Sequence, residues 1–197
     1  PADPDITGKS KLAKLRLDYN KLTSIPTQIM NKIPDLISLR LCHNNILDAG
    51  VFWNILEHLP NLVRLDLSYN KLRELKRQKA QKISHECLKQ ISLSGNTISH
   101  YPDSVDFPVL KSLSLDKNQL TSLPKTFAKQ HPKLEILELS HNKLRSLPAL
   151  SKAGEEKMYP LKNLTLKLEE NPIAPKFSFI VFLATHLLPS LSESKEA

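Results

Sequence analysis

Only one pair of neighbouring residues in this 197-residue chain invites a catalytic interpretation, Cys42 followed by His43. A thiol beside an imidazole could supply a nucleophile and its base. Consecutive residues of a strand point to opposite faces, however, and no third group that would orient the histidine is evident. The sequence also lacks a Gly-rich phosphate loop, H-E-x-x-H, G-x-S-x-G and paired metal-ligand spacing. We therefore expect no enzyme, no catalytic residue, no metal site and no cofactor.

Protein recognition is a second chemistry that the residue types could support. Tyrosine and arginine are enriched among interface hot spots because each combines a large contact area with a polar or charged group. Such residues recur at matching intervals early in the chain, and we predict a protein-binding patch formed by Lys14, Arg16, Tyr19, Arg40, His43, Arg64, Asp66 and Tyr69. The alternative is that these side chains only solvate exposed strands, with Asp18 and Asp66 pairing the arginines.

Phosphate binding is a third possibility, because the formal net charge is +8 and the pI is about 9.4. The densest basic cluster is Lys71, Arg73, Lys76, Arg77, Lys79 and Lys82. A charge run of this kind is more often the solvated face of a helix, and no aromatic platform accompanies it. We favour the solvated face and keep binding of nucleic acid or anionic lipid as the alternative.

These side chains are positioned by an eleven-residue frame that recurs along the chain. Its six clear copies are LAKLRLDYNKL (12–22), LISLRLCHNNI (36–46), LVRLDLSYNKL (62–72), LKQISLSGNTI (88–98), LKSLSLDKNQL (110–120) and LEILELSHNKL (134–144). A seventh copy, LKNLTLKLEENPI (161–173), carries two extra residues before its Asn, which leaves its register open. The alternation x-L-x-L-x predicts a short strand with one buried and one exposed face in each copy.

The ninth position of the frame is always asparagine. Its side-chain amide is expected to bond unpaired peptide groups where the backbone turns off each strand, at Asn20, Asn44, Asn70, Asn96, Asn118, Asn142 and Asn171. The seventh and eighth positions join the exposed strand positions on one surface. Tyr19, His43 and Tyr69 share the eighth position, so neighbouring strands should bring their rings into one stripe.

The frame L-x-x-L-x-L-x-x-N-x-L resembles that of the leucine-rich-repeat family, over residues 12–173. The resemblance implies an α/β right-handed solenoid of about seven coils, with a curved parallel sheet on the concave face and mixed helices and turns on the convex face. Residues 1–11 would be an N-terminal flank or cap, 174–191 a C-terminal capping helix and 192–197 a disordered tail. Helical spacing of apolar residues predicts a convex helix at 52–59, and a second is expected at 74–88.

The later repeats differ from the first three. Ser92, Ser94, Gly95, Ser112 and Ser114 are small, so the middle of the concave face should be shallow. Acidic residues follow, and the surface is predicted to be basic and aromatic at one end and acidic at the other. Ordinary variation of a surface would explain the same trend.

Members of this family without disulfide caps act as intracellular adaptors, regulators, ubiquitin-ligase modules and bacterial effectors, and all of these bind protein. The resemblance therefore implies a monomeric, non-catalytic module that binds a protein partner through its concave face and has no small-molecule substrate. The two cysteines form no disulfide framework, so we expect a cytoplasmic location. The ending SESKEA favours, as an alternative, a bacterial effector secreted into a host cell. The apolar run 176–191 is shorter than a membrane span and is better explained as the cap.

Overall fold

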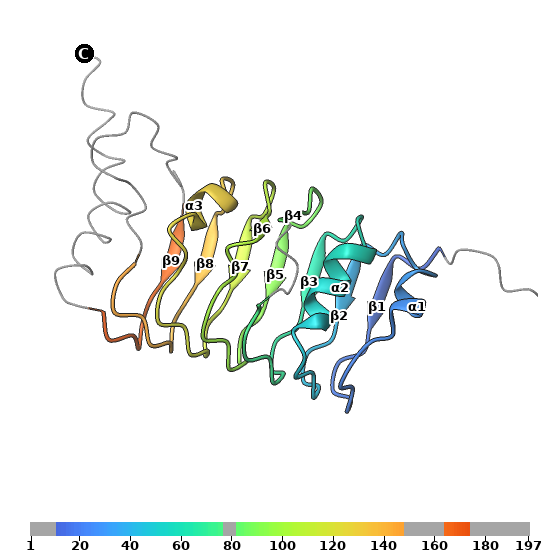
Figure 1. The fold of residues 1–197 in the computed structure, drawn as a ribbon, viewed down its shortest axis with the longest axis horizontal. Helices are drawn as coiled ribbons and strands as arrows, with labels where there is room; N and C mark the ends of the chain where they lie inside the picture. The colour runs from blue at the N-terminus through green and yellow to red at the C-terminus, as the bar shows by residue number, and fades with distance from the viewer. Residues whose placement is uncertain (1–10, 77–81, 148–163, 174–197) are drawn as a thin grey trace, which may run out of the picture.

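Seven short parallel strands form one continuous sheet. The computed structural model describes residues 11–76, 82–147 and 164–173. In spatial order the strands are β1 (Lys14–Arg16), β2 (Ser38–Arg40), β3 (Arg64–Asp66), β5 (Gln90–Ser92), β7 (Ser112–Ser114), β8 (Ile136–Glu138) and β9 (Thr165–Lys167). Figure 1 shows them side by side in a single row, in the order of the chain. Each predicted frame therefore supplies one strand, and the predicted repeat architecture is confirmed.

The strand register follows the frame. Leu15, Leu39 and Leu65 pair across β1, β2 and β3, and every later pair aligns the same frame positions. In the last coil Leu166 pairs with Leu137, so the seventh frame begins at residue 163. The two extra residues of the sequence thus precede the frame and do not interrupt it.

The core lies behind the sheet and is made by the leucines of the frame. The fourth and sixth positions point inward; Leu65 and Leu67, for example, are 1% and 0% exposed. The third and fifth positions point to the opposite side, because side chains alternate along a strand. We call that opposite side the exposed sheet face. It is the surface predicted from the sequence to bind a partner.

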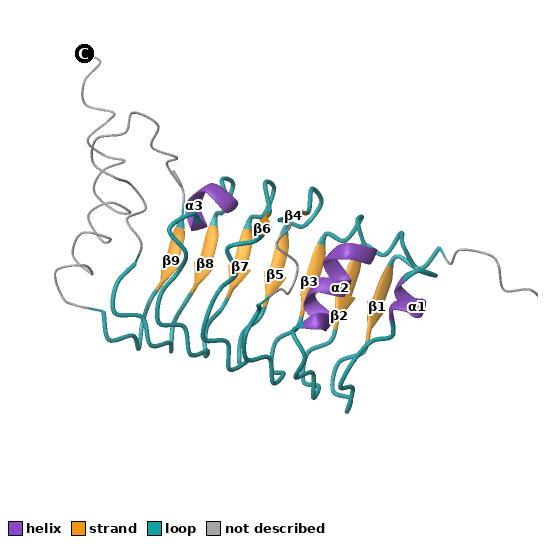
Figure 2. Ribbon diagram, in the orientation of Figure 1, coloured by secondary structure: helices purple, strands orange, loops and turns teal. Residues whose placement is uncertain are grey.

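Helices and turns close the other side of the core, which is the convex side of the expected solenoid. Helix α2 (Gly50–His58) buries Phe52, Ile55 and Leu56, which confirms the helix predicted there. Two helical turns, α1 (Thr27–Met30) and α3 (Phe127–Gln130), occupy the corresponding connections of the first and fifth repeats. Figure 2 shows these helices and the loops between them alongside the row of strands.

The helix expected at 74–88 is not formed in the described part of that segment. Strand β4 (Ile83–Ser84) pairs instead with β6 (Val105–Asp106) in a second, two-stranded parallel sheet. Ile83 and His85 are buried while Ser84 between them is exposed, which is the period of a strand. The prediction was wrong because the charged residues before Ile83 were assigned to a helix together with it.

A ladder of asparagine amides holds the coils together, as predicted. In the third coil, Asn70 Oδ1 accepts a hydrogen bond from the Ile46 N–H of the preceding coil at 3.0 Å. Its Nδ2 donates to Leu41 O of that coil and to Leu67 O and Ser68 O of its own. The side chain therefore bonds backbone groups of both coils, including the Ile46 N–H, which has no other acceptor among the described residues.

Asn171 makes the same pattern of bonds in the last coil, which independently supports the register given above. The predicted capping helix at 174–191, the tail at 192–197 and residues 1–10 of the N-terminal flank lie outside the described residues. Within residues 11–76, 82–147 and 164–173, no helix has the length and apolar character needed to span a membrane.

Candidate protein-binding surface

Three aromatic rings stack at one end of the exposed sheet face. The ring centroids of Tyr19 and His43 are 4.4 Å apart and those of His43 and Tyr69 are 4.5 Å apart. The planes are nearly parallel, at 8° and 5°. The predicted aromatic stripe is therefore present, and it is ordered more tightly than the sequence alone could show. We call these three residues the aromatic stack.

The backbone explains why the rings stack. The eighth frame position has a left-handed conformation in every coil, with φ of 56° at Tyr19, 54° at His43 and 53° at Tyr69. Equal backbone angles project the three side chains in the same direction. Neighbouring strands are spaced by about 4.8 Å, which is close to the stacking distance of two rings. The repeat therefore aligns any planar side chains placed at this position.

The next coil ends the stack with a glycine. Gly95 occupies the eighth position of the fourth frame with φ of 65°, and a Cβ atom there would lie 2.6 Å from Tyr69 Cδ1. The Tyr69 ring thus leans over the backbone of the following coil, and only glycine leaves room for it. Beyond the glycine, Lys117 Nζ lies 6.0 Å from the centroid of the Tyr69 ring, within range of a cation–π interaction. From the sequence, Gly95 was expected only to be a small residue on a shallow surface, and its packing role is seen only in the structure.

Arg40 is held between two aspartates beside the stack. Its Nε lies 3.0 Å from Asp18 Oδ2 and 3.7 Å from Asp66 Oδ2. A hydrogen bond to Cys42 Sγ and then the charge of Asp18 raise the pKa of the guanidinium, which stays charged. The arrangement matches the alternative weighed from the sequence for this arginine. Arg40 orders the surface, and its charge is compensated within the protein.

The other predicted cations remain open to solvent. Lys14, Arg16 and Arg64 are exposed and form no ion pair with the residues that the structure describes. Asp66 is half-buried and also accepts hydrogen bonds from the backbone and hydroxyl of Ser68. The structure thus brings all eight predicted residues onto three adjacent strands and their turns. We call them the N-terminal patch.

At the acidic end predicted for the surface, two carboxylates accept hydrogen bonds from neighbouring coils. Glu138 contacts Lys167 Nζ and the Ser114 hydroxyl, and the hydrogen bond from Lys167 is the main reason why the pKa of Glu138 is lowered. Ser140 hydrogen bonds to Glu169 and is the main cause of the lowered pKa of that carboxyl. Both contacts join neighbouring coils, but only Glu138 has a cation as its partner, and Glu169 keeps its negative charge available at this end of the face.

The basic cluster is also partly compensated. Lys76 Nζ lies 2.8 Å from Glu74 and Lys82 Nζ lies 2.9 Å from Asp106. Arg77 and Lys79 lie outside the described residues. The described part of the cluster gives no continuous cationic groove.

Cys42 does not have the environment of a nucleophile. The residue is 5% exposed, and burial raises the pKa of its thiol, with Asp18 acting in the same direction. The His43 ring is occupied by its two tyrosine neighbours, and in the described part of the chain no hydrogen bond joins it to Cys42. The described residues also contain no group of three or more His, Cys, Asp or Glu that could hold a metal.

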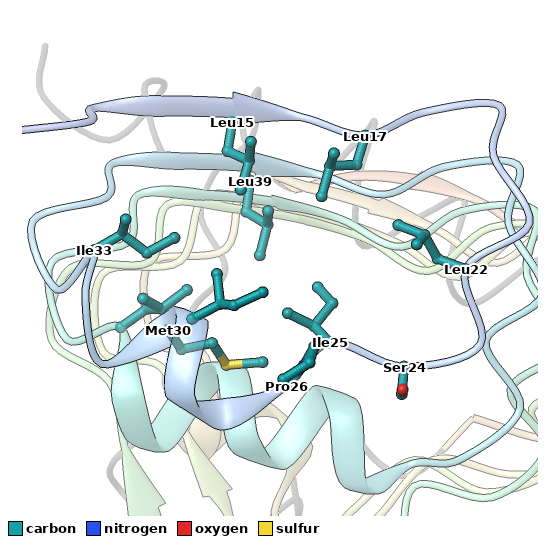
Figure 3. Close-up of a pocket in the computed structure, with 11 residues that line it drawn as sticks. Leu15, Leu17, Leu22, Ser24, Ile25, Pro26, Met30, Ile33 and Leu39 are labelled. Carbon is teal, nitrogen blue, oxygen red and sulfur yellow. The ribbon is translucent and has the colours of Figure 1, made fainter. Parts of the chain in front are cut away.

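An apolar cavity of about 100 Å³ lies between the first two coils and α1 (Figure 3). Leu15, Leu17 and Leu39 reach into it from the sheet, and Ile25 and Met30 close it from the connecting segment. Its wall has almost no polar group that would orient a ligand. The cavity lies behind the sheet and does not open onto the N-terminal patch.

The family model described as "Leucine rich repeat" matches residues 10–72 and 108–173, well over half of the chain. The chain belongs to the leucine-rich-repeat family. Members are generally non-catalytic binding proteins, and the repeat domain is typically a protein-interaction module. The parallel sheet of short strands is the fold expected for this family.

Its relatives among characterised proteins are distant leucine-rich-repeat proteins. Rat lumican is 34% identical over 58% of this chain and 35% of its own length, and pig fibromodulin is 33% identical over 56% of this chain and 71% of its own. The chain spans about a third of the length of lumican.

Several solved structures share this fold. They include TLR13 in a complex with ssRNA13 (TM-score 0.63, 26% identity, 82% of this chain and 22% of that one). They also include the Leptospira interrogans leucine-rich-repeat protein LIC12759 (TM-score 0.56, 31% identity, 88% and 47%). Listeria monocytogenes InlP (TM-score 0.58, 23% identity, 80% and 40%) shares the fold.

Proposed function

We propose that this leucine-rich-repeat chain is a non-catalytic module that binds a protein partner through its exposed sheet face, with the N-terminal patch as the main contact. The aromatic stack is the observation that carries the proposal. Tyr19 is 75% exposed and Tyr69 is 42% exposed, although both are large side chains of the type enriched at interfaces.

The patch is arranged before any partner arrives. Stacking fixes the tyrosine rings against His43, and the ion pairs of Arg40 fix the neighbouring strands. A side chain that is already ordered loses little conformational entropy on binding, where a free one would cost about 0.5–1.5 kcal/mol. The surface therefore combines contact area with low ordering cost, which favours recognition of another protein.

The test is affinity capture from cell lysate at moderate salt, followed by quantitative mass spectrometry. A Tyr19→Ala/Tyr69→Ala variant should lose the partners that the unmodified chain retains. A matched control, His141→Ala/Glu170→Ala, changes the same frame position in two later coils, where the backbone φ is 56° in both. Circular dichroism checks that both variants remain folded. If the tyrosine variant retains the same partners as the control, the N-terminal patch is not the binding surface.

Nucleic acid is a second candidate ligand, because the chain carries a net charge of +8 and TLR13, which has the same fold, was solved with an ssRNA. Phosphate-driven binding falls steeply as salt concentration rises, whereas a protein interface built on aromatic contacts is less sensitive. Recovery of nucleic acid alone, lost on adding salt, would favour this second function.

We further propose that the module works in a reducing compartment, in line with the cytoplasmic location expected from the sequence. Cys42 is buried, Cys87 is half-buried, and neither forms a disulfide. Counting free thiols by mass spectrometry on the protein purified from its own cells tests this, and a mixed disulfide on either cysteine would argue against it.

A further inference from the structure

On the exposed sheet face, the acidic residues of the strands have partners within the protein, whereas several basic residues have none in the part of the chain that the structure describes. Every acidic residue at the fifth and seventh frame positions has a partner within the protein; these acids are Asp18, Asp66, Asp116, Glu138 and Glu169. Lys14, Arg16 and Arg64 are exposed on the same face and have no ion-pair partner among the described residues. The partners of Asp116 and Glu169 are the hydroxyls of Ser94 and Ser140, which do not neutralise a carboxylate. In the first three coils, however, four cations on this face stand against only two aspartates, so the charge left there for a partner is positive.

The aromatic stack presents its edges to that partner. The two faces of the His43 ring and one face of each tyrosine ring are occupied by stacking within the protein. What remains accessible is mainly the ring edges, the tyrosine hydroxyls and the imidazole nitrogens. An aromatic ring is electron-rich on its faces and electron-poor at its edge, and hydroxyl groups donate hydrogen bonds. Edges and hydroxyls together favour a partner that carries carboxylates.

We infer that the N-terminal patch binds an acidic, extended peptide segment of its protein partner, which lies across β1, β2 and β3 along the aromatic stack. The inference deepens the proposed function and rests on it. The single-stranded nucleic acids that the charge alone would also attract are less well matched. Their bases need free ring faces on which to stack, whereas the inner faces of the stack are occupied and the outer face of Tyr69 lies against Gly95.

The strand register gives the spacing of the carboxylates. Lys14 pairs with Ser38, and Ser38 pairs with Arg64, so the two cations lie in one column with a small side chain between them. Two strand spacings are about 10 Å. A peptide in the extended polyproline II conformation rises about 3.1 Å per residue with three residues per turn, so residues three positions apart lie on the same side, about 9 Å from each other. Acidic residues three positions apart in the partner would therefore meet Lys14 and Arg64 together. Ser92, Ser112 and Ser114 leave the face uncluttered where the segment continues.

The inference is tested by selecting short random peptides displayed on phage against the full chain. Sequencing should show enrichment of Asp and Glu, with two acids three positions apart. Synthetic versions of the enriched peptides are then titrated by fluorescence anisotropy against the chain and two variants. Lys14→Glu/Arg64→Glu should weaken binding by about tenfold or more, since it removes two ion pairs and adds repulsion. Lys125→Glu/Lys129→Glu makes the same change of net charge on exposed lysines in the connection that contains α3, and should have little effect.

The outcomes separate this inference from the proposed function. If the enriched peptides lose affinity with Tyr19→Ala/Tyr69→Ala but show no preference for acids, the patch binds protein and the acidic partner is wrong. If no variant changes the affinity of the peptides, the N-terminal patch is not their binding site. A labelled oligouridine RNA serves as the second probe. The inference would be overturned in favour of a nucleic-acid partner if this RNA binds more tightly than the peptides and if Lys14→Glu/Arg64→Glu abolishes its binding.

Discussion

The amide ladder makes a quantitative prediction about stability that does not involve any partner. Replacing Asn96 by Ala removes an Oδ1 atom that accepts the Leu72 N–H at 3.0 Å. It also removes an Nδ2 group that donates to Leu67 O and Leu93 O at 3.0 Å each and to Ser94 O at 3.3 Å. The side chain is 6% exposed, so water does not readily replace these bonds.

The lost bonds differ in cost. Each of the three carbonyls keeps another donor, which is supplied by Asn70, Asn118 and Tyr69 respectively. The Leu72 N–H has no other acceptor among the described residues, and a buried donor without a partner costs about 1–3 kcal/mol. With the donor bonds added at about 1 kcal/mol or less each, we expect Asn96→Ala to lower the free energy of unfolding by about 3 kcal/mol.

Asn20→Ala provides the matched control. Asn20 occupies the same frame position in the first coil, is exposed, and donates only to Leu17 O and Asp18 O. Its loss should cost about 1 kcal/mol or less. Urea unfolding followed by circular dichroism measures both variants against the unmodified chain, with the m-value checked for a change in cooperativity. Equal losses for the two asparagines would refute the argument, because the difference rests on bonds that only the internal residue makes.

Three further predictions concern single side chains. His131 is fully buried, and burial lowers its pKa to about 3, so between about pH 6.5 and pH 3 the unfolded chain binds a proton that the folded chain does not. The free energy of unfolding should therefore fall as the pH is lowered below about 6.5, by about 2 kcal/mol at about pH 5. Urea unfolding of His131→Phe should show a smaller dependence on pH, and an unchanged dependence would refute this reasoning. Gly95→Ala should lower the free energy of unfolding by about 1 kcal/mol or more, measured by thermal unfolding, because the residue has a positive φ and its added Cβ would contact Tyr69. Adding Tyr69→Ala to this variant should relieve part of the loss, since it removes the contact. Cys42 should react with iodoacetamide at neutral pH more slowly than Cys87, since it is buried with a raised pKa; mass spectrometry of the labelled peptides would show the reverse order if this is wrong.

The repeated frame predicted the sheet well because each of its recurring positions is fixed by a contact that every coil must make. Leucines at the fourth and sixth positions must face one core, and an asparagine at the ninth must meet the same carbonyls in each coil, so the register of the clear copies could be assigned from the sequence. The seventh copy was uncertain because a frame that begins at Leu161 has two extra residues before Asn171. Only the pairing of Leu166 with Leu137 settles which spacing the backbone uses.

The convex side could not be predicted as well, because its segments differ in length and follow no common frame. Helix α2 was found from closely spaced apolar residues, whereas Ile83 and His85 follow a run of charged residues that suggested a helix. His85 is 3% exposed and its Nε2 hydrogen bonds to Leu59 O at 3.0 Å. Because His85 lies in a polar segment, its residue type alone did not indicate that it is buried. The signal that was available is the alternation of Ile83, Ser84 and His85.

Within each turn, the eighth frame position contributes to the proposed binding surface and the ninth contributes to stability. At residues 19–20, 43–44 and 69–70 an outward ring is followed directly by the asparagine of the ladder. A left-handed backbone costs a non-glycine residue about 1 kcal/mol, and every coil except the fourth bears that cost at the eighth position. Strain by itself therefore does not mark the binding site, since Lys117, His141 and Glu170 share it. The distinguishing feature of the first three coils is that their side chains at this position are planar rings that stack. Replacing the rings should thus alter recognition with little loss of stability, whereas replacing the adjacent asparagines of the second and third coils should do the opposite.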